Sequence, residues 1–242
     1  MERVAAHVFV GDLDRPSLDD DDRHHLERVL RLRAGEAVSA SDGRGGLRRC
    51  NYIGTGELEP AGEAAWEEAP SPALAVGFAL VKGGRPEWIV QKLTECGVDR
   101  IVPFVADRSV VQWEGPKAER NAERLARVAR EAAMQSRRRW LPVVDAVAPF
   151  AALVVGGPSG PGTGWVRADL DGEQPPTLDR PSILVGPEGG WSEAERAACP
   201  SAVGLGPTVL RAETAAVAVG VLLSALRAGV VAPSLSRAPR SY

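Results

Sequence analysis

The stretch GPEGGWSEAE (186–195) has one carboxylate in a turn that is otherwise nearly free of side chains. It follows ILV (183–185), an apolar run typical of a buried strand. Glycines let a ligand lie directly on the main chain, and Pro187 stiffens the turn. Ser192 and Glu195 have the S-x-x-E spacing of a capping box, which predicts where the next helix begins. Taken alone, the pattern fits a ligand-binding loop and a tight strand-to-helix turn about equally.

The glycine spacing does not match two common nucleotide-binding turns. The dinucleotide pattern G-x-G-x-x-G would need glycine where Glu188 and Trp191 stand, and no Gly-Lys-Ser/Thr follows as in a P-loop. The turn therefore predicts no phosphate ligand, and a nicotinamide-dependent oxidoreductase is disfavoured.

A second turn of the same kind lies in LGPTVLRAETA. A strand ends at Leu205-Gly206, and a loop leads into an apolar helix near Thr214, with Arg211 and Glu213 at its entry. Open parallel sheets bind ligands beyond the carboxyl ends of their strands. Two glycine-bearing strand ends, each followed by a helix, predict two backbone loops side by side.

The first part of the chain, residues 1–68, reads as short strands joined by turns. Asp42-Gly43 and Gly45-Gly46 are hairpin signals. One short helix is predicted within 21–35, with Gly35 at its C-terminal cap. Its apolar face is predicted from Leu26, Val29 and Leu30.

From residue 74 the pattern changes to alternating strands and helices, after a proline-containing linker at 67–73. The predicted strands are 74–81, 98–105, 164–170, 182–187 and 201–207. The predicted helices are one that begins at Pro86 and ends at Gly97, a long one over 116–139, and a short one followed by a mobile loop in 146–164. This order predicts an α/β domain with a mainly parallel sheet.

The composition is that of a globular protein, with 44% hydrophobic and 25% charged residues. We expect no membrane segment and no signal peptide, because neither a long apolar run nor a signal-peptide core is found. Three cysteines far apart fit neither a disulfide framework nor a metal cluster, so we expect a cytoplasmic protein without a bound metal. The cysteines are Cys50, Cys96 and Cys199.

Charge is segregated along the chain, although the net charge is only −3. Arginines are concentrated in residues 23–49 and 117–139. These stretches fit nucleic-acid contacts, but before any motif is considered, solvated helix faces are the better interpretation.

The chain resembles a known family, the bacterial 16S ribosomal RNA uridine N3-methyltransferases of the SPOUT class. The similarity covers nearly the whole chain, with the motifs in the family's order and spacing. They are HHLERVLRLRAG (24–35), KGGRPEWIVQKLTECGV (82–98), RSVVQW (108–113), EAAMQSRRR (131–139), GPEGGWSEAE (186–195) and LGPTVLRAETA (205–215).

The resemblance implies a two-domain α/β protein. Residues 1–70 would form a PUA-like β-barrel that binds RNA, and residues 73–242 a SPOUT methyltransferase domain with a deep trefoil knot. The family also implies a homodimer in which the partner chain completes each site. The implied partner is 16S ribosomal RNA or the small ribosomal subunit.

The implied cofactor is S-adenosylmethionine, which carries an adenosine but no phosphate. Close main-chain groups would recognise its adenine and ribose. One wall would come from Val185, Gly186 and Gly190, and the other from Leu205, Gly206, Leu210 and Thr214.

The implied reaction is methylation of N3 of uracil, which must lose a proton. We assign Arg211 to stabilise the resulting anion. Glu188 or Glu213 would orient the base or accept the proton, although Glu213 is equally well explained as a carboxylate at a helix N-terminus.

The target base has to leave its stack, so we expect recognition of shaped RNA. Candidate RNA contacts are His24, His25, Arg28, Arg31, Arg33 and Arg137. For the two histidines, packing at the domain junction is an equally good interpretation.

Two other functions remain open from the sequence. One is a SPOUT methyltransferase of another specificity, such as ribose 2′-O-methylation of ribosomal or transfer RNA. The other is a non-catalytic RNA-binding factor in ribosome assembly.

Overall fold

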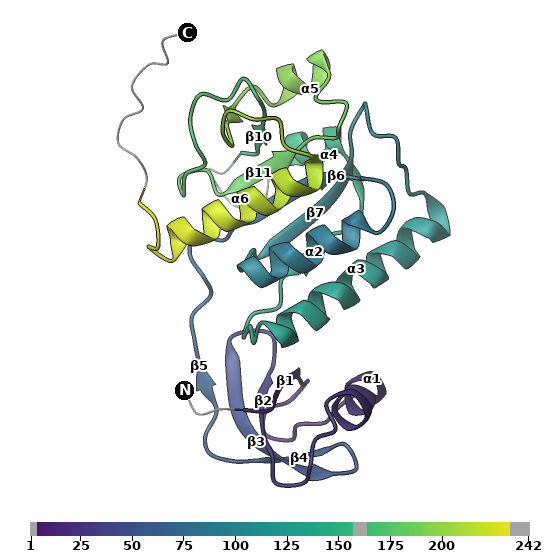
Figure 1. Cartoon of the computed structure of the whole chain (residues 1–242), viewed down its shortest axis with the longest axis vertical. Coiled ribbons are helices and arrows are strands. Elements are labelled where there is room, and N and C mark those ends of the chain that lie inside the picture. The colour runs from purple at the N-terminus through teal and green to yellow at the C-terminus, as the bar shows by residue number, and fades with distance from the viewer. Residues whose placement is uncertain (1–3, 157–163, 233–242) are drawn as a thin grey trace. The chain divides into compact units, whose positions relative to one another are not determined.

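The structure, a computed structural model, describes residues 4–156 and 164–232 (Figure 1). These residues form two compact units. Unit 1 comprises Met1–Pro70 and Ala126–Pro142, and unit 2 comprises Ser71–Leu125 and Val143–Tyr242. The break after Pro70 lies in the proline-containing linker. The expected division into 1–70 and 73–242 differs from these units at Ala126–Pro142, which belongs with unit 1.

Unit 1 contains a five-stranded sheet in the order β1-β2-β3-β4, with β5 paired to β3. The strands are β1 (Ala6–Phe9), β2 (Ala37–Ser41), β3 (Gly46–Gly54), β4 (Glu57–Pro60) and β5 (Ala65–Trp66). β1 and β2 are parallel, and the other pairs are antiparallel. The predicted hairpin between β2 and β3 is confirmed, and Gly43 and Gly45 have φ of 73° and 96°, a left-handed conformation that favours glycine.

The helix predicted within 21–35 is shorter than expected. It consists of α1 (Asp20–His24) and a π-helical turn, η1 (His25–Val29). Arg31 has φ of 53°, so the chain has left the helix before Gly35. The predicted apolar face is wrong for Val29 and Leu30, which are 62% and 45% exposed, whereas Leu26 is fully buried. The wider π turn explains this, because it rotates side chains away from the regular 3.6-residue spacing.

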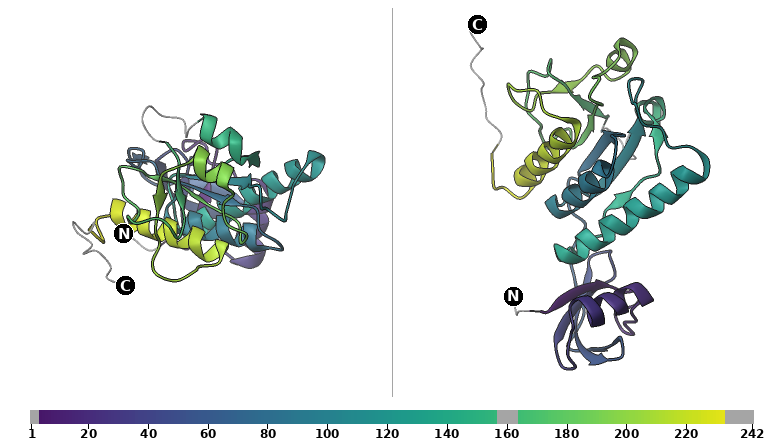
Figure 2. Two further views of the ribbon diagram at one scale, coloured as in Figure 1. Left: turned by 90° about the horizontal axis from the view of Figure 1, so that it is seen from above. Right: turned by 45° about the vertical axis from the view of Figure 1, so that its right-hand side comes forward.

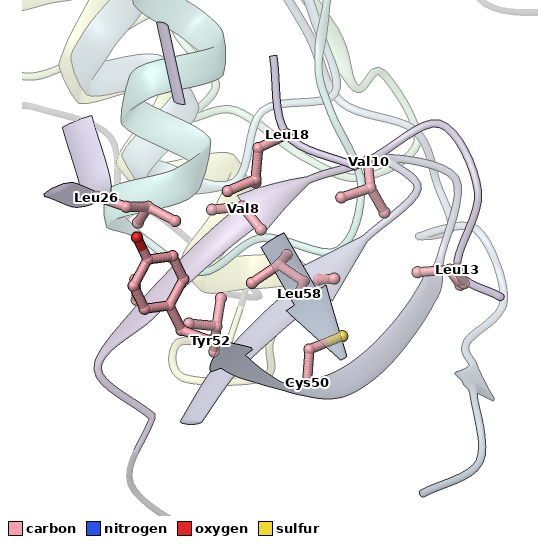
Figure 3. Close-up of a cluster of buried hydrophobic side chains, with 11 residues drawn as sticks. Val8, Val10, Leu13, Leu18, Leu26, Cys50, Tyr52 and Leu58 are labelled. Carbon is pink, nitrogen blue, oxygen red and sulfur yellow. The ribbon is translucent and has the colours of Figure 1, made fainter. Parts of the chain in front are cut away.

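The core of unit 1 explains why residues 126–142 belong to it. Figure 3 shows a cluster of buried side chains that includes Val8, Leu26 and Tyr52. Met134, in the last part of α3 (Gly115–Gln135), packs against this cluster. Arg130 of the same helix pairs with buried Asp22, with Nη2 and Oδ2 2.7 Å apart. The second half of α3 therefore completes the core of unit 1.

Unit 2 contains a seven-stranded sheet in the order β12-β10-β11-β6-β7-β8, with β9 paired to β7. Every pair is parallel, as predicted. The strands are β6 (Ala75–Ala79), β7 (Arg100–Val105), β8 (Val143–Val144), β9 (Ala148–Pro149), β10 (Val166–Ala168), β11 (Ser182–Val185) and β12 (Ala202–Val203). Each predicted strand of this unit is present but shorter than its apolar run.

Helices cover both faces of this sheet. They are α2 (Arg85–Cys96), α4 (Phe150–Gly156), α5 (Glu193–Ala198) and α6 (Ala212–Arg227), with the first part of α3. α2 and α6 lie side by side, and α6 contacts β6 and β11 (Figures 1 and 2). On the other face, α4 contributes to an apolar cluster with Phe104 of β7 and Leu184 of β11, and Trp191 and Cys199, which flank α5, belong to the same cluster. Residues 157–163, the rest of the expected mobile loop, lie outside the described residues.

The strand order changes direction between β6 and β11. These strands are neighbours in the sheet, yet the chain continues from β6 to β7 on one side, while β10 and β12 lie on the other. Such a switch point opens a crevice at the carboxyl ends of the two strands. The start of α2 follows β6, and the GPEGG turn follows β11, so both lie at this crevice.

Candidate active site

The loops that follow β11 and β12 form two walls of one pocket with a cavity of about 190 Å³. This confirms the predicted side-by-side arrangement of the two loops. Of the predicted cofactor residues, those that line the pocket are Val185, Gly186, Gly190, Leu205, Gly206 and Leu210. Thr214 is exposed on α6 and is not among the lining residues.

Glycine leaves bare main chain on both walls. Gly190 has φ of 70° and Gly206 has φ of 136°, conformations that residues with a Cβ rarely adopt. Among the described residues, nothing beyond the adjoining chain lies within 4 Å of the place where a Cβ would stand at either glycine. A ligand in the pocket therefore meets main-chain groups directly.

Trp191 anchors the GPEGG turn to the core. Its side chain is 3% exposed and stacks on Phe104, with ring centroids 6.0 Å apart and planes 6° apart. Its Nε1 donates a hydrogen bond to the carbonyl oxygen of Ala168 over 3.0 Å. The turn therefore lies on a rigid, buried support that the sequence analysis did not assign to the site.

The predicted capping box at the start of α5 is confirmed. The Glu195 N–H donates to Ser192 Oγ over 3.1 Å, and the Ser192 N–H donates to Glu195 Oε2 over 2.8 Å. Glu195 is buried, and its Oε1 also accepts from the main-chain N–H of Asp107. The Ser192 hydroxyl donates to Asp107 Oδ2 over 2.5 Å. These bonds tie the turn to the loop after β7 and fix where it ends.

Arg85 is a site residue that the sequence analysis missed. Its Nη1 donates to Glu188 Oε1 over 2.9 Å and lies 3.5 Å from Glu213 Oε2. The structure thus brings both predicted carboxylates to one guanidinium. The available sequence signal was KGGRP, an arginine between a strand end and a helix start.

Arg211 is the N-cap residue of α6 and is exposed. It is not among the residues that line the pocket. Within residues 4–156 and 164–232, its guanidinium has no hydrogen bond or ion pair. Its side chain is therefore available to an incoming group. Glu213 lies in the first turn of the same helix, where the helix dipole favours a carboxylate.

The charged residues among those lining the pocket are both acidic, Asp169 and Glu188. Asp169 is held by two arginines, with Arg167 Nη1 2.9 Å and Arg196 Nη1 2.8 Å from its Oδ2. Glu188 is likewise paired with Arg85, so arginines offset the charge of both carboxylates. The lining residues described for this pocket include no arginine or lysine that would hold a phosphate.

The chain matches two family models. Residues 67–224 match an RNA methyltransferase domain, and residues 18–59 match an RNA methyltransferase PUA domain. The chain belongs to the RNA methyltransferase family. The first match contains every residue of the pocket described above.

Named relatives of this family are similar over most of the chain. Ribosomal RNA small subunit methyltransferase E of Mycobacterium bovis is 35% identical over 229 residues, covering 86% of each chain. The enzyme of the same name from Bacillus subtilis is 32% identical over 218 residues, covering 82% of this chain and 85% of its own.

Solved structures share the fold. A probable rRNA-methyltransferase from Porphyromonas gingivalis is 26% identical, with a TM-score of 0.77 over 93% of this chain and all of its own. The small subunit methyltransferase E of Neisseria gonorrhoeae, bound to S-adenosyl methionine, is 24% identical, with a TM-score of 0.74 over 92% of this chain and 97% of its own. The α/β fold of this family is therefore shared by crystal structures.

A groove in unit 1 gathers some of the predicted RNA contacts. It has a volume of about 780 Å³ and lies between the α1–η1 segment and the second half of α3. His24, His25 and Arg137 line it. The other predicted contacts, Arg28, Arg31 and Arg33, are exposed but are not among the lining residues.

A buried histidine lies at the floor of this groove. His7 Nε2 donates to the carbonyl oxygen of Arg138 over 2.9 Å, and its Nδ1 lies 2.8 Å from Ser39 Oγ. Burial lowers the pKa of His7 from 6.5 to about 4, against the hydrogen bond to Arg138, and the nearby charges of Arg137 and Arg139 lower it further. His7 is therefore neutral at pH 7.

The described residues contain neither a candidate membrane span nor a candidate metal cluster. None of the helices there is both long and apolar enough to span a bilayer. Within the same residues, no three His, Cys, Asp or Glu side chains are grouped closely enough to ligate a metal ion.

Proposed function

We propose that this chain transfers a methyl group from S-adenosylmethionine to N3 of a uridine in 16S ribosomal RNA. The observation that carries the proposal is the pocket between two bare main-chain loops in an RNA methyltransferase domain. The names of the relatives at 32–35% identity support small-subunit ribosomal RNA as the substrate.

The pocket suits the proposed cofactor. Adenine and ribose need close N–H and C=O groups, which the bare main chain at Gly190 and Gly206 offers. The lining residues described for this pocket include no arginine or lysine, so they offer no cation to a phosphate-bearing cofactor. When bound, the sulfonium supplies an electrophilic methyl group.

The chain's own residues then have to hold and deprotonate the base. Both candidate proton acceptors pair with Arg85, Glu188 at 2.9 Å and Glu213 at 3.5 Å. Glu188 also lines the pocket, so it is the better candidate for accepting the N3 proton. Arg211, whose guanidinium is free within the described residues, stabilises the negative charge that the ring carbonyls gain. The uracil nitrogen attacks only if it is aligned with the methyl group, so positioning contributes much of the rate.

The groove in unit 1 supports a role in RNA binding. His24, His25 and Arg137 line a groove that also contains the exposed side chains of Val29 and Leu30, so an RNA chain has a guanidinium, two imidazoles and an apolar surface to contact. The carboxylates of Asp19, Asp21, Asp22 and Glu131 share this lining, and Arg130 pairs with two of them, Asp19 and Asp22. Arg28, Arg31 and Arg33 extend the basic surface beside it.

The finer features of the family are part of the proposal. These are the SPOUT class, a deep trefoil knot, closure of the unit 1 sheet into a PUA-like barrel, and a cytoplasmic homodimer. Support for the knot comes from the return of α6 from the edge strand β12 to β6 and β11 in the middle of the sheet. Val209 supports the homodimer, because it lines the pocket and is 80% exposed, so a partner chain has apolar surface to cover.

A deletion strain tests the proposed function. Small-subunit RNA from the strain should lack a methyl group on one uridine base, and the restored gene should return it at N3. A methyl group lost from a ribose 2′-oxygen would instead assign the other SPOUT chemistry. An unchanged methylation pattern would favour the alternative function, a non-catalytic RNA-binding factor in ribosome assembly.

A further inference from the structure

Arg85 links the two segments that carry the proposed catalytic carboxylates. Glu188 lies in the turn after β11, and Glu213 lies in the first turn of α6. Both carboxylates approach the same atom, Nη1 of Arg85, at 2.9 and 3.5 Å. One nitrogen therefore sets the distance between two groups that come from different segments of the chain.

The start of α2 restricts the position of the Arg85 guanidinium. Arg85 is the first residue of α2, and its Nε donates to the carbonyl oxygen of Lys82 over 3.1 Å. Pro86 follows, with a backbone dihedral that suits a helix start. The next turn of the helix is anchored in the core, because Ile89 and Val90 are fully buried. The cation thus has less freedom than an arginine on a loop.

The ion pairs of Arg85 are too exposed for a mainly structural role. The side chains of Arg85 and Glu188 are 39% and 48% exposed. Ion pairs of this exposure contribute little to folding stability. Catalysis is far more sensitive, because a displacement of about 1 Å at a reacting group costs about 100-fold in rate.

We infer that Arg85 is a positioning residue of the methyl-transfer site, which holds Glu188 and Glu213 at fixed places beside the pocket. Without the cation, the two carboxylates repel each other and the turn after β11 separates from the start of α6. This inference rests on the proposed function, because the site it completes is the one assigned to methyl transfer.

Three variants and a control test the inference. Arg85→Gln removes the cation, and Arg85→Lys keeps a positive charge that can occupy the single bridging position. Arg100→Gln is the matched control, since Arg100 pairs with Asp145 over 2.7 Å at the amino end of β7, the edge of the sheet opposite the pocket. Turnover, the dissociation constant of S-adenosylmethionine and the melting temperature are measured for each. The third variant, Glu213→Gln, is measured alone and in combination with Arg85→Gln.

The expected result is a selective loss of turnover. Arg85→Gln should lower kcat about 100-fold with little change in cofactor affinity, and Arg85→Lys should recover part of that loss. Arg100→Gln should keep wild-type turnover. In the Glu213→Gln background, Arg85→Gln should cost much less than it does alone, because the two residues act as a unit.

Several results would overturn the inference. The first is a turnover of Arg85→Gln equal to that of Arg100→Gln. The second is a variant that loses cofactor affinity but keeps its turnover. The third is a double variant in which the effects of the two substitutions on turnover add. If Arg85→Gln is too unstable to assay, Arg85→Lys decides: partial turnover supports the inference, and turnover below detection in a folded protein contradicts it. Absence of turnover in the wild type is a separate outcome and rejects the proposed function itself.

Discussion

The indole ring of Trp191 lies directly against the main chain of Gly186. A Cβ built on Gly186 would stand 2.9 Å from the ring, closer than real Cβ contacts come. Trp191 has no room to move away, because it is stacked on Phe104 and bonded to the carbonyl oxygen of Ala168. The wall of the pocket is therefore in place only if residue 186 lacks a side chain.

Gly186→Ala should displace the turn and weaken cofactor binding. Overpacking of this kind costs about 1–3 kcal/mol of folding stability. We expect the affinity for S-adenosylmethionine to fall at least about tenfold, which is about 1.4 kcal/mol of binding free energy. Titration calorimetry measures it. Gly11→Ala is the control, because no atom of the described residues beyond the adjoining chain lies within 4 Å of its Cβ position. Equal affinities in the two variants would contradict this expectation.

Arg211→Ala should abolish methylation while leaving cofactor binding nearly intact. Arg211 is outside the residues that line the pocket, so the cofactor loses no direct contact. Loss of one donor to a developing anion costs about 100-fold or more in turnover. Single-turnover assays with saturating cofactor separate the two effects. Unchanged turnover in the variant would remove Arg211 from the mechanism.

Folding stability should fall as the pH is lowered from about 6.5 to about 4 because of His7. Burial depresses the pKa of His7 to about 4 in the folded state, so over this range the unfolded chain takes up a proton that the folded chain does not. The full effect is about 3 kcal/mol. Denaturation at pH 7, 5.5 and 4.5 gives the free energy of unfolding of the wild type and of His7→Gln. The variant should take up about one proton fewer on unfolding, so its stability should depend less on pH. Identical pH dependence in both proteins would show that His7 does not contribute.

Arg137→Glu should weaken RNA binding and flatten its salt dependence. Arg137 lines the unit 1 groove, and loss of one phosphate contact lowers the slope of log K against log salt by about 0.7–0.9. The control is Arg180→Glu, an equal charge change at an exposed arginine of unit 2. Binding isotherms at several salt concentrations give the slope. If both variants show the wild-type slope, the groove does not bind phosphates.

The sequence was sufficient to predict where the pocket lies. Apolar runs ending in glycine predicted two strand ends, and parallel strands bring such ends to one edge of a sheet. The S-x-x-E spacing predicted the start of α5 because the capping box is a local interaction between Ser192 and Glu195. The structural part of these predictions depended on residues close together in the chain.

Long-range relationships were not predictable from local patterns. Arg85 and Glu188 are 103 residues apart, and only the strand order brings the start of α2 to the turn after β11. In the same way, α3 reads as one helix, and nothing in its periodicity shows that Met134 in its second half packs against the buried cluster of unit 1. The π turn that exposes Val29 was not predictable either, because the spacing of apolar residues was read with the 3.6-residue period of an α-helix.

Transfer of labelled methyl groups decides whether this chain methylates N3 of a uridine. Purified protein is incubated with small ribosomal subunits that lack the modification and with S-adenosylmethionine labelled in its methyl group, and the RNA is then digested to nucleosides. We expect the label to be recovered in 3-methyluridine from a single position. Label in a 2′-O-methylated nucleoside, or no label in RNA from a folded protein that binds the cofactor, would contradict it.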